Sequence, residues 1–409
     1  MKLRERDIRN VLVIGVDVVS LAASARKAGY RVYAADYFGD QDLKCLCHES
    51  RSIVKQTPGG NCGQLSIDFK PEAFLQLTRE FLKNNEIDAA LLSSGLDDSL
   101  DVLFELNDMI PILGNHPSII EKIRDKMTFF QELKRLGIPH PETAIVKNFE
   151  EAKEKSKDIG YPVVVKPLRG FGGAGIRKAQ DPRELGQAFH NASLIDEKVL
   201  VQEYVSGIPA SASLISSTNE AIALTLNEQL LGVNEVGQEE PFGYCGNVVP
   251  LVATSPVADR CKRMAERIVS HFGLVGSNGI DLVISKESMP YVIEVNPRFQ
   301  GTLECVERVL GINLVETHMK ACIEGDLPTI VKNPLVFCVR LILFTPRRSV
   351  VPDLNTFEEA RDIPQPNVII EKGEPFCSII VEEKTRSSAL KKARMSAKVI
   401  YERLQLRID

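Results

Sequence analysis

Residues 291–300 read YVIEVNPRFQ, an apolar strand pattern that carries a polar side chain at every second position from residue 294. Alternate side chains of a strand point to the same face of its sheet. One face of this strand therefore carries a carboxylate, two amides and a guanidinium, namely Glu294, Asn296, Gln300 and Arg298. Carboxylate and amide oxygens suit Mg²⁺ held against a polyphosphate, and the guanidinium suits a second anion. The alternative is an edge strand with a solvated polar face.

A second apolar strand, GIDLVIS at residues 279–285, places Asp281 thirteen residues before Glu294. Two strands can thus supply acidic ligands to one pair of metal ions. This arrangement is the first indication of a site that handles phosphates.

Length, composition and charge describe an ordinary globular protein. The chain has 409 residues, 44% of them apolar and 26% charged, which predicts two to four domains. A formal net charge of -5 argues against a nucleic-acid binder. No membrane span is expected, because the apolar run VLVIGVDVVSLAASA is interrupted by Asp17. The leader MKLRERDIRN does not resemble a secretory signal, so we expect a cytoplasmic protein without a membrane partner.

Nine cysteines occur without a CxxC pair, and we expect reduced thiols. Cys45, Cys47 and His48 lie close together, but no second pair of metal ligands stands at a suitable spacing.

The N-terminal part alternates strand and helix, beginning with VLVIGV, SLAASARKAGY and RVYAAD. This alternation predicts a parallel, Rossmann-like sheet. Asp36 ends the third of these segments and could imitate a ribose-binding acid, but the first turn, GVDVVS, lacks the glycines of a dinucleotide site. An NAD-dependent enzyme is therefore disfavoured, and we expect a substrate at the sheet's carboxyl edge. Candidate substrate residues are Asp17, Ser20, Ser93, Ser94 and Asp97, together with Gln300 and Glu304.

The chain from residue 116 has an α+β pattern. PSIIEKIRDKMTFFQELKRLG, residues 117–137, predicts one long helix closed by Gly137. YPVVVKP ends a strand with Lys166, and RGFGGAGI follows with glycines at 170, 172, 173 and 175. Glycines free backbone N–H groups to surround phosphate oxygens, although the lysine precedes them and the loop is not a P-loop. A surface hairpin tip is the alternative to phosphate contact.

Taken in order, these motifs resemble the ATP-grasp superfamily, nearest its biotin-carboxylase and carbamoyl-phosphate-synthase branch. The order is Lys126, Lys166, the glycine loop, the strand VLVQEYVSG, Asp281 and EVNPR. The resemblance implies an α/β and α+β protein with the ATP-grasp fold. It further implies a Rossmann-like pre-ATP-grasp domain at 1–115, an ATP-grasp domain at 116–330 with a lid at about 140–205, and a small C-terminal α+β domain at 331–409.

The resemblance also implies roles for individual residues. Lys126 and Lys166 would contact ATP phosphates beneath a lid formed by Gly170, Gly172, Gly173 and Gly175. Gln202, Glu203 and Val205 would contact adenine. Asp281, Glu294 and Asn296 would hold Mg²⁺, or Mn²⁺ in its place. Arg298 and Lys166 would be catalytic, with Arg298 facing the transferring phosphoryl group.

Some positions depart from the family pattern. Pro209 stands about where many members carry an acid for the ribose, so the ribose contact is unassigned. The segment GTLE follows NPRFQ, which shifts Glu304 out of register with the base of biotin-dependent carboxylases, and no AMKM biotin-attachment motif occurs.

The leading hypothesis is an ATP-dependent ligase that activates a carboxylate as an acyl phosphate for attack by an amine or a thiol. Its partners would be small-molecule acids and amines, and the related branches suggest a homodimer. A bicarbonate-activating carboxylase is the alternative within the superfamily. A nucleotide-binding module without turnover is the alternative from another class.

Overall fold

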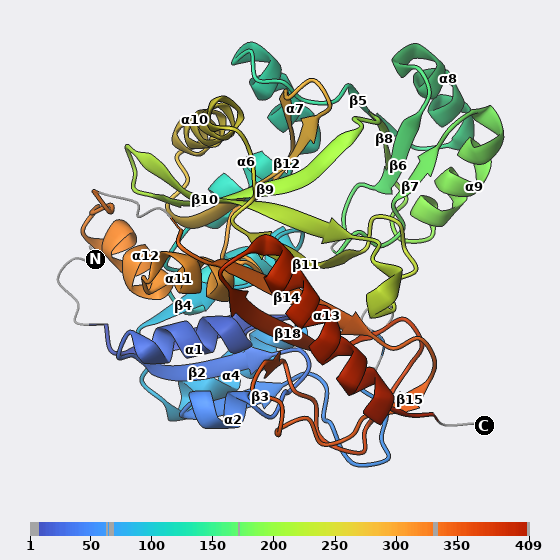
Figure 1. Ribbon diagram of the computed structural model, residues 1–409. Helices are drawn as coiled ribbons and strands as arrows, with labels where there is room; N and C mark the ends of the chain where they lie inside the picture. Colours follow the sequence, from blue (N-terminus) through green and yellow to red (C-terminus); the bar gives the residue numbers. More distant parts are fainter. Residues whose placement is uncertain (1–7, 63, 65–68, 171, 330–333, 407–409) are drawn as a thin grey trace.

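The computed structural model describes residues 8–62, 64, 69–170, 172–329 and 334–406 (Figure 1). Most of the leader MKLRERDIRN and Phe171 of the glycine loop lie outside these residues. The structure has the mixed α/β and α+β character expected from the sequence.

The N-terminal sheet has four strands in the order β3-β2-β1-β4, and every pairing is parallel. Its strands are β1 (Asn10–Gly15), β2 (Arg31–Asp36), β3 (Glu49–Ser52) and β4 (Ala89–Leu92), and its helices are α1 (Val19–Lys27), α2 (Leu43–Leu46), α4 (Ala73–Asn84) and α5 (Leu100–Met109). The segment PILG, residues 111–114, adds one parallel bridge to this sheet, between Ile112 and Ala90. The parallel order places the carboxyl ends of β1 and β2 side by side, where such sheets bind ligands.

A central sheet of eight strands runs in the order β13-β12-β9-β10-β11-β14-β18-β16. Its strands are β9 (Gly207–Ser216), β10 (Ala221–Leu231), β11 (Tyr244–Val249), β12 (Gly276–Ser285), β13 (Pro290–Asn296), β14 (Phe337–Phe344), β16 (Ala360–Arg361) and β18 (Pro375–Glu383). Because β11 pairs with β14, strands from both sides of residue 330 share this sheet. The domain boundaries expected from the sequence stay predictions.

The two faces of the central sheet differ, as the alternation of its strands predicted. Ile280 and Leu282 of β12 are buried in an apolar core with helix α10 (Ser255–Phe272), whose buried residues include Ile268 and Val269. Asp281, between them, points to the other face, since neighbouring strand residues alternate. That polar face is the one available for a site.

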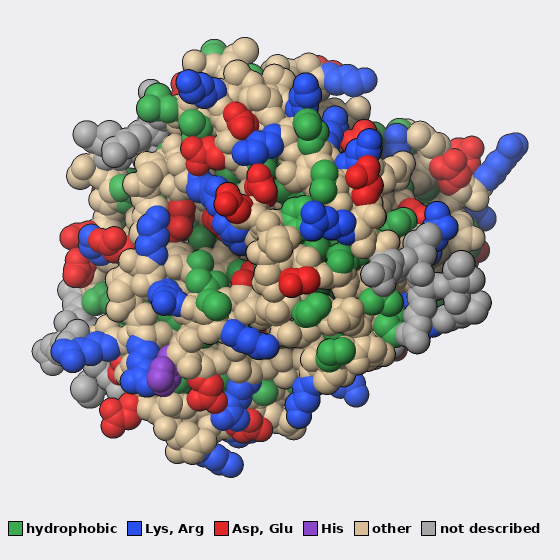
Figure 2. Space-filling model, turned by 60° about the horizontal axis from the view of Figure 1, so that its bottom comes forward, with side chains coloured by type: hydrophobic (Ala, Val, Ile, Leu, Met, Phe, Trp, Pro, Cys, Tyr) green, Lys and Arg blue, Asp and Glu red, His purple; other side chains and the backbone are tan. Residues whose placement is uncertain are grey.

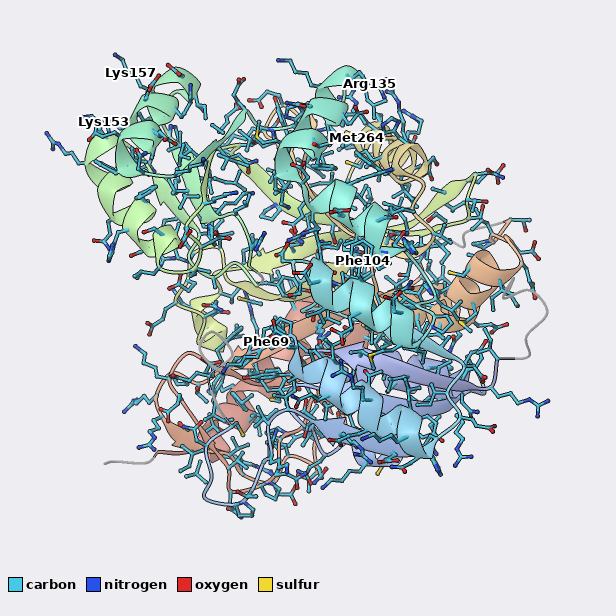
Figure 3. All side chains as sticks on the ribbon, turned by 180° about the vertical axis from the view of Figure 1, so that it is seen from behind. Phe69, Phe104, Arg135, Lys153, Lys157 and Met264 are labelled. Carbon is cyan, nitrogen blue, oxygen red and sulfur yellow. The ribbon has the colours of Figure 1, made fainter. Side chains whose placement is uncertain are left out.

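A smaller antiparallel sheet, β5-β8-β6-β7, forms the lobe at the upper right of Figure 1. Its elements are β5 (Thr143–Val146), β6 (Val163–Pro167), β7 (Arg177–Ala179), β8 (Val199–Glu203), α8 (Phe149–Ile159) and α9 (Pro182–Ser193). Figure 3 shows Lys153 and Lys157 extending from α8 at the outer side of this lobe. The glycine loop joins β6 to β7. The strand expected through Val205 ends at Glu203.

The single helix expected at 117–137 is wrong, because the structure has two helices there. Helix α6 (Pro117–Arg124) ends at Asp125, and α7 (Lys126–Arg135) begins after it. The Asp125 side chain accepts hydrogen bonds from the backbone N–H groups of Met127 and Thr128, which caps α7 and interrupts the helical run.

The remaining elements complete the C-terminal half. They are the short helix η2 (Asn234–Val236), the helices α11 (Leu303–Leu310), α12 (Leu314–Ile323) and α13 (Arg386–Arg403), and a three-stranded sheet of β15 (Ser349–Val350), β17 (Ile369–Ile370) and β19 (Gln405–Leu406). Helix α13 packs against β14 and β18. Over the described residues, none of the helices has the length and apolar character needed to cross a membrane. Figure 2 shows positive and negative side chains interspersed on one face of the molecule.

Candidate active site

Two carboxylates face each other on the polar side of the central sheet. Asp281 of β12 pairs in register with Glu294 of β13. Asp281 accepts hydrogen bonds from the Gln229 amide at 3.0 Å and from the Asn296 amide at 3.1 Å. Burial, and then the charge of Glu294, raise the pKa of Asp281 to about 6. Such a pair favours a bound cation, which would relieve the repulsion between the two groups.

Cations surround Glu294. Its carboxylate forms an ion pair with Arg124, and the ammonium of Lys126 lies 3.5 Å from the same oxygen. Burial alone would raise the pKa of Glu294, but Lys126, Arg124 and Lys166 outweigh burial and hold the pKa well below its usual range. Arg124 is in turn fixed by Asp98, whose carboxylate accepts from its Nε at 2.6 Å.

Lys166 enters the same site from the smaller sheet. Its ammonium donates to the Gln202 amide oxygen at 3.0 Å, and Gln202 donates to Thr143 at 2.7 Å. Burial, and next the charge of Lys126, lower the pKa of Lys166 to about 8, while the charge of Glu294 opposes them. Lys166 and Glu294 therefore share one electrostatic environment, although they lie on different sheets.

The glycine loop rests on neighbouring parts of the chain. The N–H of Gly170 donates to Asp98 at 3.1 Å, and the N–H of Tyr244 donates to the carbonyl of Gly172 at 3.0 Å. At Gly173, which has φ +83°, an added Cβ would lie 2.0 Å from the carbonyl oxygen of Phe242. Glycine is required at that position by both conformation and space. The contact of this loop with phosphates stays a prediction.

Arg298 is held in place rather than free in solvent. Its Nε donates to Asp97 at 2.7 Å, and its terminal nitrogen lies 3.3 Å from the Asn296 amide oxygen. Its side chain is 13% exposed. Asn296 thus links Arg298 to Asp281, so the residue expected to face an anion and the residue expected to bind a metal belong to one hydrogen-bonded group.

The expected adenine contacts meet competing hydrogen bonds. The Gln202 side chain is 3% exposed and is occupied by Lys166 and Thr143. The N–H of Glu203 donates to the carbonyl of Glu142 at 2.8 Å, and the contact of Glu203 with adenine stays a prediction. Val205 lies in the link between β8 and β9. Pro209 lies within β9 and pairs with Val283, so the ribose contact stays unassigned.

One of the expected substrate residues, Asp97, contacts this constellation, and the others contact one another or neighbouring residues. Asp97 binds Arg298, and the Ser93 hydroxyl donates to the carbonyl of Asp17. The Ser20 hydroxyl lies 3.4 Å from the Glu304 carboxylate. Ser94 contributes its carbonyl to Val16, and Gln300 lies 3.4 Å from the Ser213 hydroxyl.

Sequence reasoning missed Arg124, Asp98, Gln229, Thr143 and Arg340. Arg124 stands two residues before Lys126, and the helix break at Asp125 directs both toward Glu294; that break was the missed signal. Arg340 is 2% exposed, and its guanidinium contacts Asp17 and Asp362, each at 2.7 Å. A charged residue inside the apolar strand VFCVRLILF was a signal that the sequence did offer.

The residues present fit Mg²⁺ at Asp281 and Glu294. The described residues contain no group of three or more histidine, cysteine, aspartate or glutamate side chains arranged for a metal. Mg²⁺ commonly takes one or two carboxylates and completes its octahedron with water and phosphate oxygens. Two facing carboxylates beside the Asn296 amide meet that requirement.

Comparisons with known proteins agree with this geometry. Residues 123–302 match the family model of the ATP-grasp domain. An uncharacterised protein of Methanocaldococcus jannaschii is 25% identical over 383 residues, covering 92% of this chain and 89% of the relative. The C-terminal section of the carbamoyl phosphate synthase large chain of Methanopyrus kandleri is 27% identical over 224 residues, covering 54% of this chain. This chain covers only 41% of that relative's length.

Two solved structures share the fold over almost the whole chain. The biotin carboxylase domain of Hydrogenobacter thermophilus 2-oxoglutarate carboxylase, a dimer in complex with MgADP and bicarbonate, has a TM-score of 0.75 and 17% identity. The match covers 98% of this chain and 91% of that one. The L-amino acid ligase of Bacillus licheniformis has a TM-score of 0.71 and 14% identity, with 99% and 100% covered.

Residues 123–302 match the ATP-grasp domain, and the chain is similar to ATP-dependent enzymes of the ATP-grasp superfamily, of which two with the same fold were crystallised with MgADP or an ATP analogue. Within it, the chain is near the branch of carbamoyl phosphate synthase and biotin carboxylase.

Proposed function

We propose that this protein is an ATP-dependent ligase that activates a carboxylate as an acyl phosphate and joins it to an amine. The observation that carries the proposal is the joint placement of Lys126 and Lys166 beside the Asp281–Glu294 pair. Phosphoryl transfer asks a protein mainly for positioning and for cancellation of charge. Cations and paired carboxylates in one site supply both.

The residues would divide the work as follows. Lys126 and Lys166 would bind the phosphate oxygens of ATP beneath the glycine loop. Asp281, Glu294 and Asn296 would hold Mg²⁺, which neutralises phosphate charge when bound. Arg298, fixed by Asp97, would stabilise negative charge on the phosphoryl group as it moves to the substrate carboxylate.

An acyl phosphate makes the reaction possible, because a free carboxylate is a poor electrophile. The γ-phosphoryl group forms a bond to a carboxylate oxygen as its bond to ADP breaks. The amine then attacks the carbonyl carbon, and phosphate leaves. The products are an amide, ADP and phosphate.

A bicarbonate-activating carboxylase is the second candidate, because the fold of the 2-oxoglutarate carboxylase domain covers 98% of this chain. Measuring ADP release with a panel of carboxylic and amino acids, each with and without bicarbonate, tests the two. The ligase requires release that depends on an organic acid and an amine and is unaffected by bicarbonate. Release that depends on bicarbonate would favour the carboxylase. If no compound in the panel supports ADP release, with or without bicarbonate, both candidates are contradicted, and a nucleotide-binding module without turnover is favoured.

A further inference from the structure

A second group of ionisable residues lies around Arg340 at the carboxyl edge of the N-terminal sheet. Asp17 follows β1, and Asp36 ends β2. Asp40 and Asp42 lie in the loop after β2, and Asp362 follows β16 of the central sheet. We call these five residues the aspartate cluster. These acids lie together, because Arg340 contacts both Asp17 and Asp362, the N–H of Asp362 donates to Asp42 at 2.9 Å, and Asp36 and Asp40 interact electrostatically with Asp17 and Asp362.

The aspartate cluster carries more negative charge than its neighbours neutralise. Arg340 donates to Asp17 and to Asp362, each at 2.7 Å, and it also contacts the Ser378 hydroxyl and the Gly301 carbonyl. Arg361 donates to Glu304 at 3.1 Å, so much of its charge is already matched.

Burial is the main cause that raises the pKa values in the cluster, and repulsion between its carboxylates adds to it. Burial, and next the charge of Asp17, raise the pKa of Asp362 to about 7. Burial likewise raises the pKa of Asp42 to about 6 and the pKa values of Asp36 and Asp40 well above their usual value.

Two acceptor atoms in the cluster lack a hydrogen-bond partner. Asp36 is 1% exposed; its Oδ2 accepts from the N–H of Gly39 at 2.6 Å, and its Oδ1 has no partner. Asp362 uses Oδ2 for Arg340, and its buried Oδ1 also has no partner. Buried acceptors without donors are costly and uncommon in native proteins. Both atoms therefore indicate a missing donor.

The aspartate cluster is also connected to the candidate active site. Asn247 of β11 pairs in register with Arg340 and accepts from the Tyr244 hydroxyl at 2.8 Å. The Nδ2 of Asn247 is a buried donor without a partner. Arg340 bonds Gly301, three residues after Arg298. Asp17 is 30% exposed, which gives the cluster a side open to solvent.

We propose that the aspartate cluster binds the ammonium group of a substrate, with Asp36 and Asp362 as its principal acceptors. An ammonium carries one positive charge and three N–H donors, which match the charge excess and the two free acceptors. A divalent metal fits less well, because no group of three metal-binding side chains is arranged for one among the described residues.

The proposal narrows the substrate class of the proposed ligase, on which it rests. Carboxylates stabilise the protonated form of an amine, and a protonated amine does not attack an acyl phosphate. The ammonium held here is therefore a recognition group that stays protonated. One substrate would be an amino acid or a polyamine, with its reacting group directed toward Arg298 and Asn247.

Thermal unfolding with matched probes tests the ammonium site without turnover. The probes are β-alanine against 3-hydroxypropionate, and putrescine against 1,4-butanediol, so each pair differs in the ammonium. We expect the amine of at least one pair to raise the unfolding temperature of the wild type saturably, while its partner does not. Asp36→Asn should weaken this binding about tenfold to hundredfold, and Asp259→Asn, at an exposed position of α10, should leave it unchanged.

The unliganded variant gives a second readout. Asp36→Asn keeps the acceptor for Gly39 and removes a repelled carboxylate, so it should unfold at a higher temperature than the wild type at pH 8. A purely structural role for Asp36 would lower that temperature instead. Absence of amine binding, equal amine binding in Asp36→Asn, or stabilisation by Mg²⁺ or Ca²⁺ alone through Asp36 would each overturn the proposal.

Turnover separates this proposal from the ligase assignment. ADP release supported equally by substrates without an ammonium would overturn the ammonium site and leave the ligase standing. Amine binding that depends on Asp36, with no acid supporting ADP release, would leave the ammonium site standing and contradict the ligase.

Discussion

The charge state of Lys166 should control the affinity for ATP above neutral pH. In the protein without nucleotide, burial and the neighbouring Lys126 lower the pKa of Lys166 from 10.5 to about 8. This shift corresponds to about 3 kcal/mol of interaction that disfavours the ammonium. A bound triphosphate would favour the ammonium and return its pKa toward the usual value. Binding should therefore weaken as the pH rises through the lowered pKa, because the free enzyme then loses a proton that the complex retains.

The size of the effect follows from the two pKa values. With a pKa near 8 in the free enzyme and near 10.5 in the complex, the dissociation constant should rise about tenfold from pH 7 to pH 9 and about 25-fold by pH 9.5. At pH 8, binding should take up about half a proton per nucleotide, because Lys166 is then about half protonated. Lys126, whose pKa burial also lowers, adds in the same direction.

Isothermal titration calorimetry with a non-hydrolysable ATP analogue and Mg²⁺ measures both quantities, the proton uptake by comparing buffers of different ionisation enthalpy. Lys166→Arg should flatten most of the pH dependence, since arginine stays protonated throughout. Lys157→Arg, on the outer side of α8 (Figure 3), is the matched control and should behave as the wild type. A wild-type affinity independent of pH, or an equal slope in Lys166→Arg, would refute the role given to Lys166.

Three further predictions concern the same site. Arg298→Ala should leave the circular dichroism spectrum unchanged and lower turnover about a hundredfold, equivalent to about 3 kcal/mol, and near-normal turnover would contradict its role. Glu294→Gln should lower the free energy of unfolding by about 3 kcal/mol in chemical denaturation, because Arg124 and Lys126 lose their shared carboxylate; unchanged stability would argue against that network. Gly173→Ala should weaken ATP binding more than Gly172→Ala, since both have positive φ but only Gly173 meets a carbonyl, and equal effects would show that loop packing is unimportant.

The strands and their polar face could be predicted because local alternation encodes them. Asp281 and Glu294 each stand within an apolar run of their own strand, and a strand's period of two fixes the face to which each side chain points. The order of the motifs then led to the superfamily and the fold class, both of which are confirmed. The individual roles of the site residues stay predictions.

The rest depends on contacts between distant segments or on a competition between local preferences. One helix through Asp125 would satisfy the apolar period of 117–137. The Asp125 side chain instead accepts hydrogen bonds from the first backbone N–H groups of α7, and this capping interaction divides the segment into two helices. The aspartate cluster joins Asp17 to Arg340, 323 residues later in the chain. No local pattern reports such a contact, so only the buried arginine in an apolar strand could have pointed to it.

The central claim is that the triphosphate and its metal lie between the two lysines and the Asp281–Glu294 pair. A crystal structure with Mn²⁺ and a non-hydrolysable ATP analogue, with the metal located by its anomalous signal, tests this claim most directly. We expect Mn²⁺ within coordination distance of both carboxylates, and phosphate oxygens within hydrogen-bonding distance of Lys126 and Lys166. Metal and phosphates bound elsewhere, with Glu294 still paired to Arg124 and remote from them, would contradict it.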